Sequence, residues 1–369
     1  MSDPRQTNLA NILVNYCVKV QPGQWVAVLG SVIAEPLINQ IQDKIVQAGG
    51  YPTIQFFSEA LDESFMRSAS EDQLKWISPL SELIYSKADA VISVWATRNV
   101  KSHSQIPAER SRIQQLSAQQ LMQVFSQRMA AGSLKWVGTQ YPCQSYAQEA
   151  EMSLWEYEDF VYSATLADQP DAVSAWQKVK QHQQRYADYL RGKKDIRIRS
   201  PHADLHLSIE ERDFLNDGGE SNMPGGEIYT SPVENSANGW IEFTYPAIED
   251  GREVTGIRLE FADGKVTRAS AQKNEDFLLE MLEVDAGARY LGEFAFGTNY
   301  GITHFSKSLL FDEKIGGTIH LALGNGFPEI GSKNTSSLHW DMVCDMRSGE
   351  ITADGEVFYR DGHFVIQGK

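Results

Sequence analysis

The period of the apolar residues changes near residue 192, and this change constrains the fold more than any other feature of the sequence. Before it, apolar residues recur at helical spacing and alternate with short, continuous apolar runs. After it, apolar and polar residues alternate, as at Ile196 and Ile198, which is typical of strands that bury one face. A chain of 369 residues is also long enough for two cores. We therefore predict an α/β domain over residues 1–192 and a β-rich (α+β) domain over residues 193–369.

Four apolar runs in the first half are predicted to be strands of one sheet. They lie at residues 25–29, 51–57, 90–95 and 134–139. Segments with helical periodicity precede or separate them, and two more helices are predicted after them, at 156–166 and 171–190. Because strands that alternate with helices are typical of doubly wound folds, we predict that this sheet is parallel.

The second half is predicted to consist mainly of strands. Besides the first alternating segments, strands are expected at 240–245, 257–261 and 266–269. The pair Asp263-Gly264 lies between the last two and is typical of a tight hairpin turn. One helix is expected among the strands, over residues 275–289, with Phe277 and Leu278 facing inward.

The composition argues against several classes of partner and compartment. The chain has 33 basic and 49 acidic side chains and a formal net charge of -16, so its field repels nucleic acids and anionic membranes. No run approaches the roughly 18 apolar residues of a membrane-spanning helix, and the N-terminal segment has no apolar signal region. The three cysteines, Cys17, Cys143 and Cys344, lie far apart without a C-x-x-C pair, as expected of reduced thiols. We expect a cytoplasmic protein without nucleic-acid or membrane partners.

Common nucleotide and nucleophile motifs are absent from the first half. It contains no Gly-x-Gly-x-x-Gly segment, and its first predicted strand ends in LGSVIAEP, which has neither the glycine spacing nor the lysine of a phosphate-binding loop. It also contains no Gly-x-Ser-x-Gly nucleophile elbow. Neither a dinucleotide site nor a serine-hydrolase site is therefore expected there.

The candidate chemistry lies in the second half, where glycine- or proline-bearing turns surround single carboxylates and imidazoles. The segments are MPGGEIYTSP with Glu227, LGEFAFGTN with Glu293, TIHLALGNG with His320, and LHWDMVCD with His339 and Asp341. Residues two apart on a strand point to the same side, so His339 and Asp341 can face one point. A buried glutamate or histidine is more often a hydrogen-bonded structural group than a metal ligand, and residue type and spacing alone leave both interpretations open.

As a metal site, this set of residues would have a defined chemistry. Imidazoles and carboxylates together suit zinc, cobalt or manganese ions. Three carboxylates and two histidines are enough for two divalent ions that share a bridging carboxylate. Two ions about 3.5–4 Å apart can hold a hydroxide nucleophile and polarise a carbonyl group, which is the chemistry of an aminopeptidase.

Four longer motifs, in this order and spacing, resemble those of one family of two-metal peptidases. They are NMPGGEIYTSPVE, GARYLGEFAFGTN, FDEKIGGTIHLALG and KNTSSLHWDMVCD. The sequence resembles the aminopeptidase T, aminopeptidase S and PepS family along its whole length. The resemblance implies that Glu227, Glu293, His320, His339 and Asp341 bind two divalent ions. Analogy with other two-metal peptidases leaves open that Glu227 or Glu293 serves instead as general base. The resemblance also implies that short peptides are the substrates, and that the protein is a homodimer with an internal cavity.

One residue departs from the pattern of the family. Relatives that resemble this chain have a tyrosine seven residues after the first histidine, where this chain has Phe327, and that phenol is expected to assist catalysis. Loss of one oxyanion donor can lower turnover about 100- to 1000-fold. Three functions therefore stay open: an active aminopeptidase, a weakened relative that binds metal and peptide, and a binding protein whose ions only stabilise the fold.

We predict supporting roles for three residues that lie near the candidate ligands in the sequence. Asn299 and Tyr300, which follow Glu293 in the segment GTNYG, are candidates to orient a ligand. Trp340 lies between His339 and Asp341 and is expected to point to the opposite side, into a core.

Overall fold

The computed structural model describes residues 3–249 and 251–366. Its contacts divide the chain into two compact units, which are described separately. Unit 1 extends to Trp176 and also includes Gly219–Pro224, whereas unit 2 comprises Gln177–Gly218 and the chain from Gly225 onward. The division into domains at residue 192 stays a prediction.

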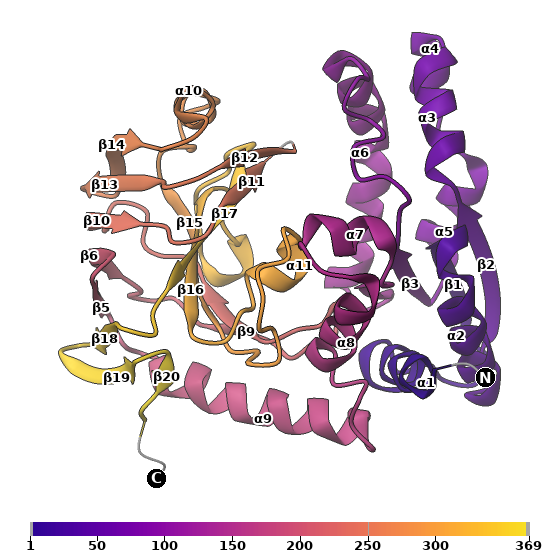
Figure 1. The fold of residues 1–369 in the computed structure, drawn as a ribbon, viewed down its shortest axis with the longest axis horizontal. Coiled ribbons are helices and arrows are strands. Elements are labelled where there is room, and N and C mark those ends of the chain that lie inside the picture. Colours follow the sequence, from indigo (N-terminus) through magenta and orange to yellow (C-terminus); the bar gives the residue numbers. More distant parts are fainter. Residues whose placement is uncertain (1–2, 250, 367–369) are drawn as a thin grey trace. The chain divides into compact units, whose positions relative to one another are not determined.

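The sheet of unit 1 is parallel, as predicted, and it has five strands (Figure 1). Its strands in spatial order are β2 (Tyr51–Phe57), β1 (Trp25–Ser31), β3 (Ala90–Trp95), β4 (Lys135–Gln140) and β8 (Asn222–Met223). The four predicted strands are confirmed. The fifth strand, β8, was not predicted, because two residues are too short to show any period.

One helix of unit 1, α2 (Glu35–Gln47), buries the apolar face that the sequence indicates. In α2 the residues Leu37, Ile38, Ile41 and Ile45 are all buried. The first helix, α1 (Pro4–Asn11), continues as a π-helix over Ile12–Cys17. The remaining helices are α3 (Glu59–Ser68), α4 (Glu71–Leu74), α5 (Pro79–Lys87), α6 (Ala108–Ala130), α7 (Gln144–Glu149) and α8 (Leu154–Ala164), and α9 (Ala172–Leu190) continues into unit 2.

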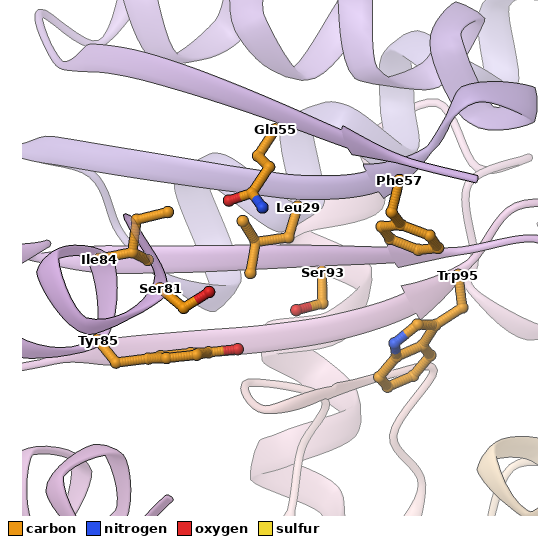
Figure 2. Close-up of a pocket in the computed structure, with 8 residues that line it drawn as sticks. All are labelled: Leu29, Gln55, Phe57, Ser81, Ile84, Tyr85, Ser93 and Trp95. Carbon is orange, nitrogen blue, oxygen red and sulfur yellow. The ribbon is translucent and has the colours of Figure 1, made fainter. Parts of the chain in front are cut away.

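A hollow of about 300 Å³ lies at the carboxyl ends of β1, β2 and β3 in unit 1 (Figure 2). Its lining residues are Leu29, Gln55, Phe57, Ser81, Ile84, Tyr85, Ser93 and Trp95. None of them is an acid, a base or a histidine, and burial raises the pKa of Tyr85 above its ordinary value. The hollow is therefore lined by uncharged groups at neutral pH.

Unit 2 is rich in antiparallel strands, which confirms the predicted change of period. One sheet has eight strands, in the order β14 (Lys265–Ser270), β13 (Arg258–Ala262), β10 (Asn238–Glu242), β6 (Ala203–Ser208), β5 (Asp195–Ser200), β18 (Glu350–Ala353), β19 (Glu356–Arg360) and β20 (His363–Phe364). A second has five, in the order β17 (His339–Asp345), β16 (Thr318–Gly324), β15 (Leu291–Gly297), β9 (Glu227–Thr230) and β7 (Leu215–Asp217). A hairpin of β11 (Ala247–Glu249) and β12 (Arg252–Val254) and the short helix α11 (Leu309–Asp312) complete the unit.

One core joins the two large sheets of unit 2. Phe294 and Phe296 of β15 are completely buried in it and contact each other with ring centroids 4.9 Å apart. Trp340 is 1% exposed and packs against Phe277 at 5.9 Å between centroids. The packing role predicted for Trp340 is confirmed, and the alternate residues of the same strands are left to face the other side of the five-stranded sheet.

The helix predicted over 275–289 was too long. In the structure α10 covers only Glu275–Met281. The helix does not continue to residue 289, because the carboxylate of Asp285 accepts hydrogen bonds from the backbone N–H groups of Gly287 and Ala288 and from the Ser336 hydroxyl. Such local bonds compete with the helical ladder. Among the described residues, no helix is both long and apolar enough to cross a bilayer.

Candidate metal centre

The five candidate residues lie on one face of the sheet β17–β16–β15–β9–β7. Glu227 begins β9, Glu293 lies in β15, His320 in β16, and His339 and Asp341 in β17. In the strand register, Ala322 of β16 lies between Glu293 and Asp341. Because side chains alternate along each strand, the apolar partners of these residues enter the core while all five polar groups emerge together.

The polar atoms converge within a few ångströms. His320 Nε2 lies 3.4 Å from Glu293 Oε1, 3.5 Å from Glu227 Oε2 and 3.9 Å from Asp341 Oδ1. His339 Nε2 lies 3.2 Å from Glu293 Oε2 and 3.5 Å from Asp341 Oδ2. Four of the residues are buried, and the side chain of His339 is 33% exposed. The structure therefore brings together all five residues that the sequence nominated as metal ligands.

Backbone carbonyls orient both imidazole rings. Nδ1 of His320 lies 3.0 Å from the carbonyl oxygen of Glu313, and Nδ1 of His339 lies 2.8 Å from that of Asn325. A carbonyl can only accept, so each Nδ1 is the donor in these bonds. The lone pair of a neutral ring is then on Nε2, which faces the carboxylates. This arrangement is typical of histidines that bind a metal ion.

The protein groups perturb one another strongly. Burial opposes ionisation of Glu293, but hydrogen bonds with the two histidines outweigh it and lower its pKa to about 2. Burial likewise opposes protonation of the imidazoles, yet the contacts with Glu293 raise the pKa of His320 to about 10 and that of His339 to about 9. Burial raises the pKa of Asp341 to about 6 and that of Glu227 above its ordinary value. The metal-free cluster thus holds protons that a cation would displace.

Two oxygen atoms of the cluster are buried without any hydrogen-bond partner among the described residues. They are Oε2 of Glu227 and Oδ1 of Asp341. A buried, unsatisfied oxygen is unfavourable unless an ion or another donor completes its environment. The oxygen and imidazole donors fit a first-row divalent ion, so the residues present suit the metal that the sequence suggests.

The donor atoms form two groups that share one residue. Glu227, Glu293 and His320 make one group, and Glu293, His339 and Asp341 make the other; within each group the ligand atoms lie within 4.8 Å of one another. Glu293 belongs to both groups. Each group could hold a metal ion.

A buried lysine borders the cluster. Lys314 has no exposed surface, and its Nζ lies 3.5 Å from Glu227 Oε1, 3.9 Å from Asp217 Oδ2 and in contact with the carboxylate of Glu313. Burial disfavours its charge, but these three carboxylates outweigh burial and raise its pKa. A fixed positive charge therefore lies beside one side of Glu227.

The loop before β9 is held closely against the segment that follows β15. Gly226 has a positive φ of 121°, and a Cβ there would lie 2.5 Å from Cβ of Asn299. The Asn299 amide donates to the carbonyl of Gly225 at 3.0 Å. Asn299 thus supports the backbone that leads to Glu227, whereas the Tyr300 hydroxyl donates to the carbonyl of Gly362 and has no contact with the five residues.

Aromatic rings border the cluster at the carboxyl end of β16. The Phe327 ring lies 4.9 Å from the Tyr229 ring and 5.8 Å from the His339 ring, measured between centroids. The backbone N–H of Phe327 donates to Ser231 Oγ at 2.9 Å, which fixes this loop against the end of β9. Phe327 therefore occupies the edge of the site, but its ring offers no hydrogen-bond donor.

Sequence reasoning missed Lys314 and Tyr229 as members of this environment. Lys314 follows the acidic pair Asp312-Glu313 in a loop, and nothing in that pattern indicates burial. A signal existed for Tyr229, because it lies two residues after Glu227 on the same strand, and the rule that paired His339 with Asp341 applies to it as well.

Comparisons with known proteins relate the whole chain to one family and one fold. The profile of the family described as thermophilic metalloprotease (M29) matches residues 2–364. Aminopeptidase 2 of Geobacillus stearothermophilus is 25% identical over 406 aligned positions, and Aminopeptidase AmpS of Bacillus subtilis is 26% identical over the same length; each alignment covers 97% of both chains. The solved structure of wild-type AmpT from Thermus thermophilus superposes with a TM-score of 0.85 at 20% identity, covering 98% of this chain and 99% of that one, and it shares the fold.

Proposed function

The chain belongs to the thermophilic metalloprotease (M29) family, and on that premise we propose that it removes N-terminal residues from short peptides with two divalent ions. Membership of the family, with aminopeptidases as relatives over nearly the whole length, supports a metal-dependent aminopeptidase acting on peptide bonds. The observation that carries the two-ion proposal is the pair of ligand groups that share Glu293.

The charges of the site also favour two divalent cations. Five carboxylates are gathered there, those of Asp217, Glu227, Glu293, Glu313 and Asp341, together with the single ammonium group of Lys314. With neutral imidazoles, this set leaves four negative charges, which two divalent ions would neutralise. Burial makes an uncompensated charge costly, so a single divalent ion would leave the site less well balanced.

Glu227, Glu293, His320, His339 and Asp341 would hold the ions, and zinc, cobalt and manganese all suit these donors. Such ions supply a nucleophile at neutral pH and polarise the scissile carbonyl group. Groups of the protein accept and donate the protons of the reaction. A water molecule adds to the carbonyl carbon, and Glu227 or Glu293, serving as general base instead of as a ligand, accepts the proton that the water loses. The C–N bond breaks as the leaving amine gains a proton. The products are a free amino acid and a shortened peptide.

Lys314 would position Glu227 for this role. Its ammonium group contacts Oε1 of Glu227, whereas Oε2 of the same carboxylate faces His320. One oxygen is thus held by a protein charge and the other is directed to the site. We also retain short peptides as substrates, a homodimer as the assembly and the cytoplasm as the location, as the sequence and the resemblance imply.

The proposal is tested by hydrolysis of a panel of dipeptides and aminoacyl anilides. Purified protein is stripped of metal and reloaded with zinc, cobalt or manganese, and bound metal is counted. We expect metal-dependent release of the N-terminal residue with two ions per chain, abolished in Glu293→Gln and kept in Glu356→Gln, which changes an exposed carboxylate of β19. No release with any ion, despite bound metal, would overturn the proposal.

A further inference from the structure

Tyr229 has the same orientation as the candidate metal ligands. It lies two residues after Glu227 on β9, so both side chains emerge from one face of the sheet. In the register, Tyr229 pairs with Ala295, and Ala295 pairs with His320. Only the small side chain of Ala295 therefore separates Tyr229 from an imidazole of the cluster along this row. A phenol is thus placed beside the site by the strands themselves.

The hydroxyl group of Tyr229 is available to a ligand. Among the described residues, no protein group hydrogen-bonds to it, and its oxygen is not one of the fully buried, unsatisfied atoms, so it keeps access to solvent. The ordinary pKa of a phenol, about 10, lies well above neutral pH. At neutral pH it is a protonated donor without a protein acceptor, in contrast to Tyr300, whose hydroxyl is bound to a carbonyl.

Phe327 holds this ring in place. Its ring lies 4.9 Å from that of Tyr229 with the planes at 56°, and also contacts His339. The loop that bears Phe327 is fixed by its N–H bond to Ser231, two residues beyond Tyr229 on the chain. The two rings therefore form one packed edge of the site, and of the two only Tyr229 can donate a hydrogen bond.

We propose that Tyr229 is a catalytic residue, whose hydroxyl donates a hydrogen bond to the scissile carbonyl oxygen as that oxygen gains negative charge. The donor stabilises the tetrahedral intermediate while water adds to the carbonyl carbon, and the bond weakens when the C–N bond breaks and the carbonyl re-forms. The proton of the phenol is shared and never transferred, so the reaction stays balanced as written above. This inference rests on the proposed aminopeptidase function.

The first test compares Tyr229→Phe with the wild-type protein, both loaded with the same ion. Loss of one oxyanion donor predicts a fall in kcat of about 100- to 1000-fold, with KM and metal affinity each changed less than about threefold. Tyr189→Phe, which removes a phenol on α9, is the matched control and should keep full activity. A phosphinic dipeptide analogue, which mimics the tetrahedral geometry, should bind Tyr229→Phe at least tenfold more weakly, while product binding is unchanged.

A second pair of variants tests whether a phenol at position 327 can replace the phenol of Tyr229. Phe327→Tyr would add a second phenol to this edge of the site. Combined with Tyr229→Phe, it should recover much of the lost turnover. If Tyr229→Phe keeps wild-type kcat and analogue affinity in an active enzyme, only the role of Tyr229 is overturned. If the wild-type protein hydrolyses no peptide with any ion, the aminopeptidase function fails and this role fails with it.

Discussion

The hollow of unit 1 and the cluster of unit 2 are two features that a ligand could use, and they differ in kind. The hollow of unit 1 has space, about 300 Å³, but none of its lining residues is an acid, a base or a histidine (Figure 2). The cluster of unit 2 brings five ionisable residues within a few ångströms. The hollow therefore provides space without ionisable groups, whereas the cluster provides the donor atoms that the proposed reaction requires.

The difference follows from the two kinds of sheet. In the parallel sheet the carboxyl ends of β1, β2 and β3 meet at one edge, and side chains around that edge enclose a hollow. In the antiparallel sheet, residues of neighbouring strands lie side by side on one face, so β9, β15, β16 and β17 can bring their polar groups together. Burial makes the pKa of each such group depend on its neighbours.

The largest effect is expected for the residue that both ligand groups share. Glu293→Gln keeps the shape of the side chain but removes a negative charge and a possible proton acceptor. Turnover should fall about 100- to 10000-fold, the range for loss of a positioned general base, and bound metal should fall from two ions per chain to one or none. Activity assays and metal analysis check both. Retained stoichiometry with full activity would show that Glu293 is a structural group, as buried glutamates often are.

The next largest effect is expected for Lys314→Met in the metal-free protein. Removing one partner of a buried ion pair leaves uncompensated charges and typically costs about 3–5 kcal/mol of unfolding free energy. Saturating metal should restore part of the loss, because the ions replace the missing positive charge. Urea denaturation with and without metal measures both quantities. Lys333→Met, at an exposed lysine, is the control and should change stability by less than about 0.5 kcal/mol.

A smaller effect concerns pH and separates the metal-free from the metal-bound state. The pKa values of His320 and His339 are raised to about 10 and about 9 in the metal-free fold. A raised pKa stabilises the fold fully below the unfolded value of about 6.5 and loses this contribution as pH rises through the folded value. The unfolding free energy of the metal-free protein should therefore decrease between pH 7 and pH 10.

Bound metal should remove most of this slope, because the ligand imidazoles are then neutral in the folded state. Binding should also release protons near pH 7, which calorimetry in buffers of different ionisation enthalpy can count. Equal slopes with and without metal, and no proton release, would show that the two histidines do not bind the ions.

Much of the fold could be predicted from the sequence, because long elements carry a period. The strands β1 to β4 and the buried face of α2 were visible as apolar runs and helical spacing. The strand β8 was not, since its two residues are defined only by their pairing with β4. The end of α10 was missed because Asp285 acts through backbone groups beyond it.

The site was predictable to the extent that motifs mark it. The five candidate residues stand out by their turns and by resemblance to a family, and the structure brings them together, although their role as ligands stays a proposal. Lys314 could not be nominated, because its charged surroundings include Asp217 of β7 and Glu227 of β9, which are distant in sequence, besides its neighbour Glu313. The position of Tyr229 near the site could have been predicted, since Tyr229 shares a strand face with Glu227. Its packing against Phe327 could not, because that contact depends on a loop that follows β16.

The smallest effect is expected in the hollow of unit 1. Ser81→Leu would fill it with apolar atoms, since Ser81 projects into it from α5 (Figure 2), and Ser86→Leu on the exposed side of the same helix is the matched control. Because the hollow offers neither a charge nor a metal ligand, both variants should keep metal affinity and kcat/KM within about twofold of the wild type, as surface substitutions usually do. Peptide hydrolysis and metal titration measure these values. A fall in kcat/KM of more than about fivefold in Ser81→Leu but not in Ser86→Leu would mean that substrate binding depends on the hollow. The hollow would then belong to the functional site together with the cluster.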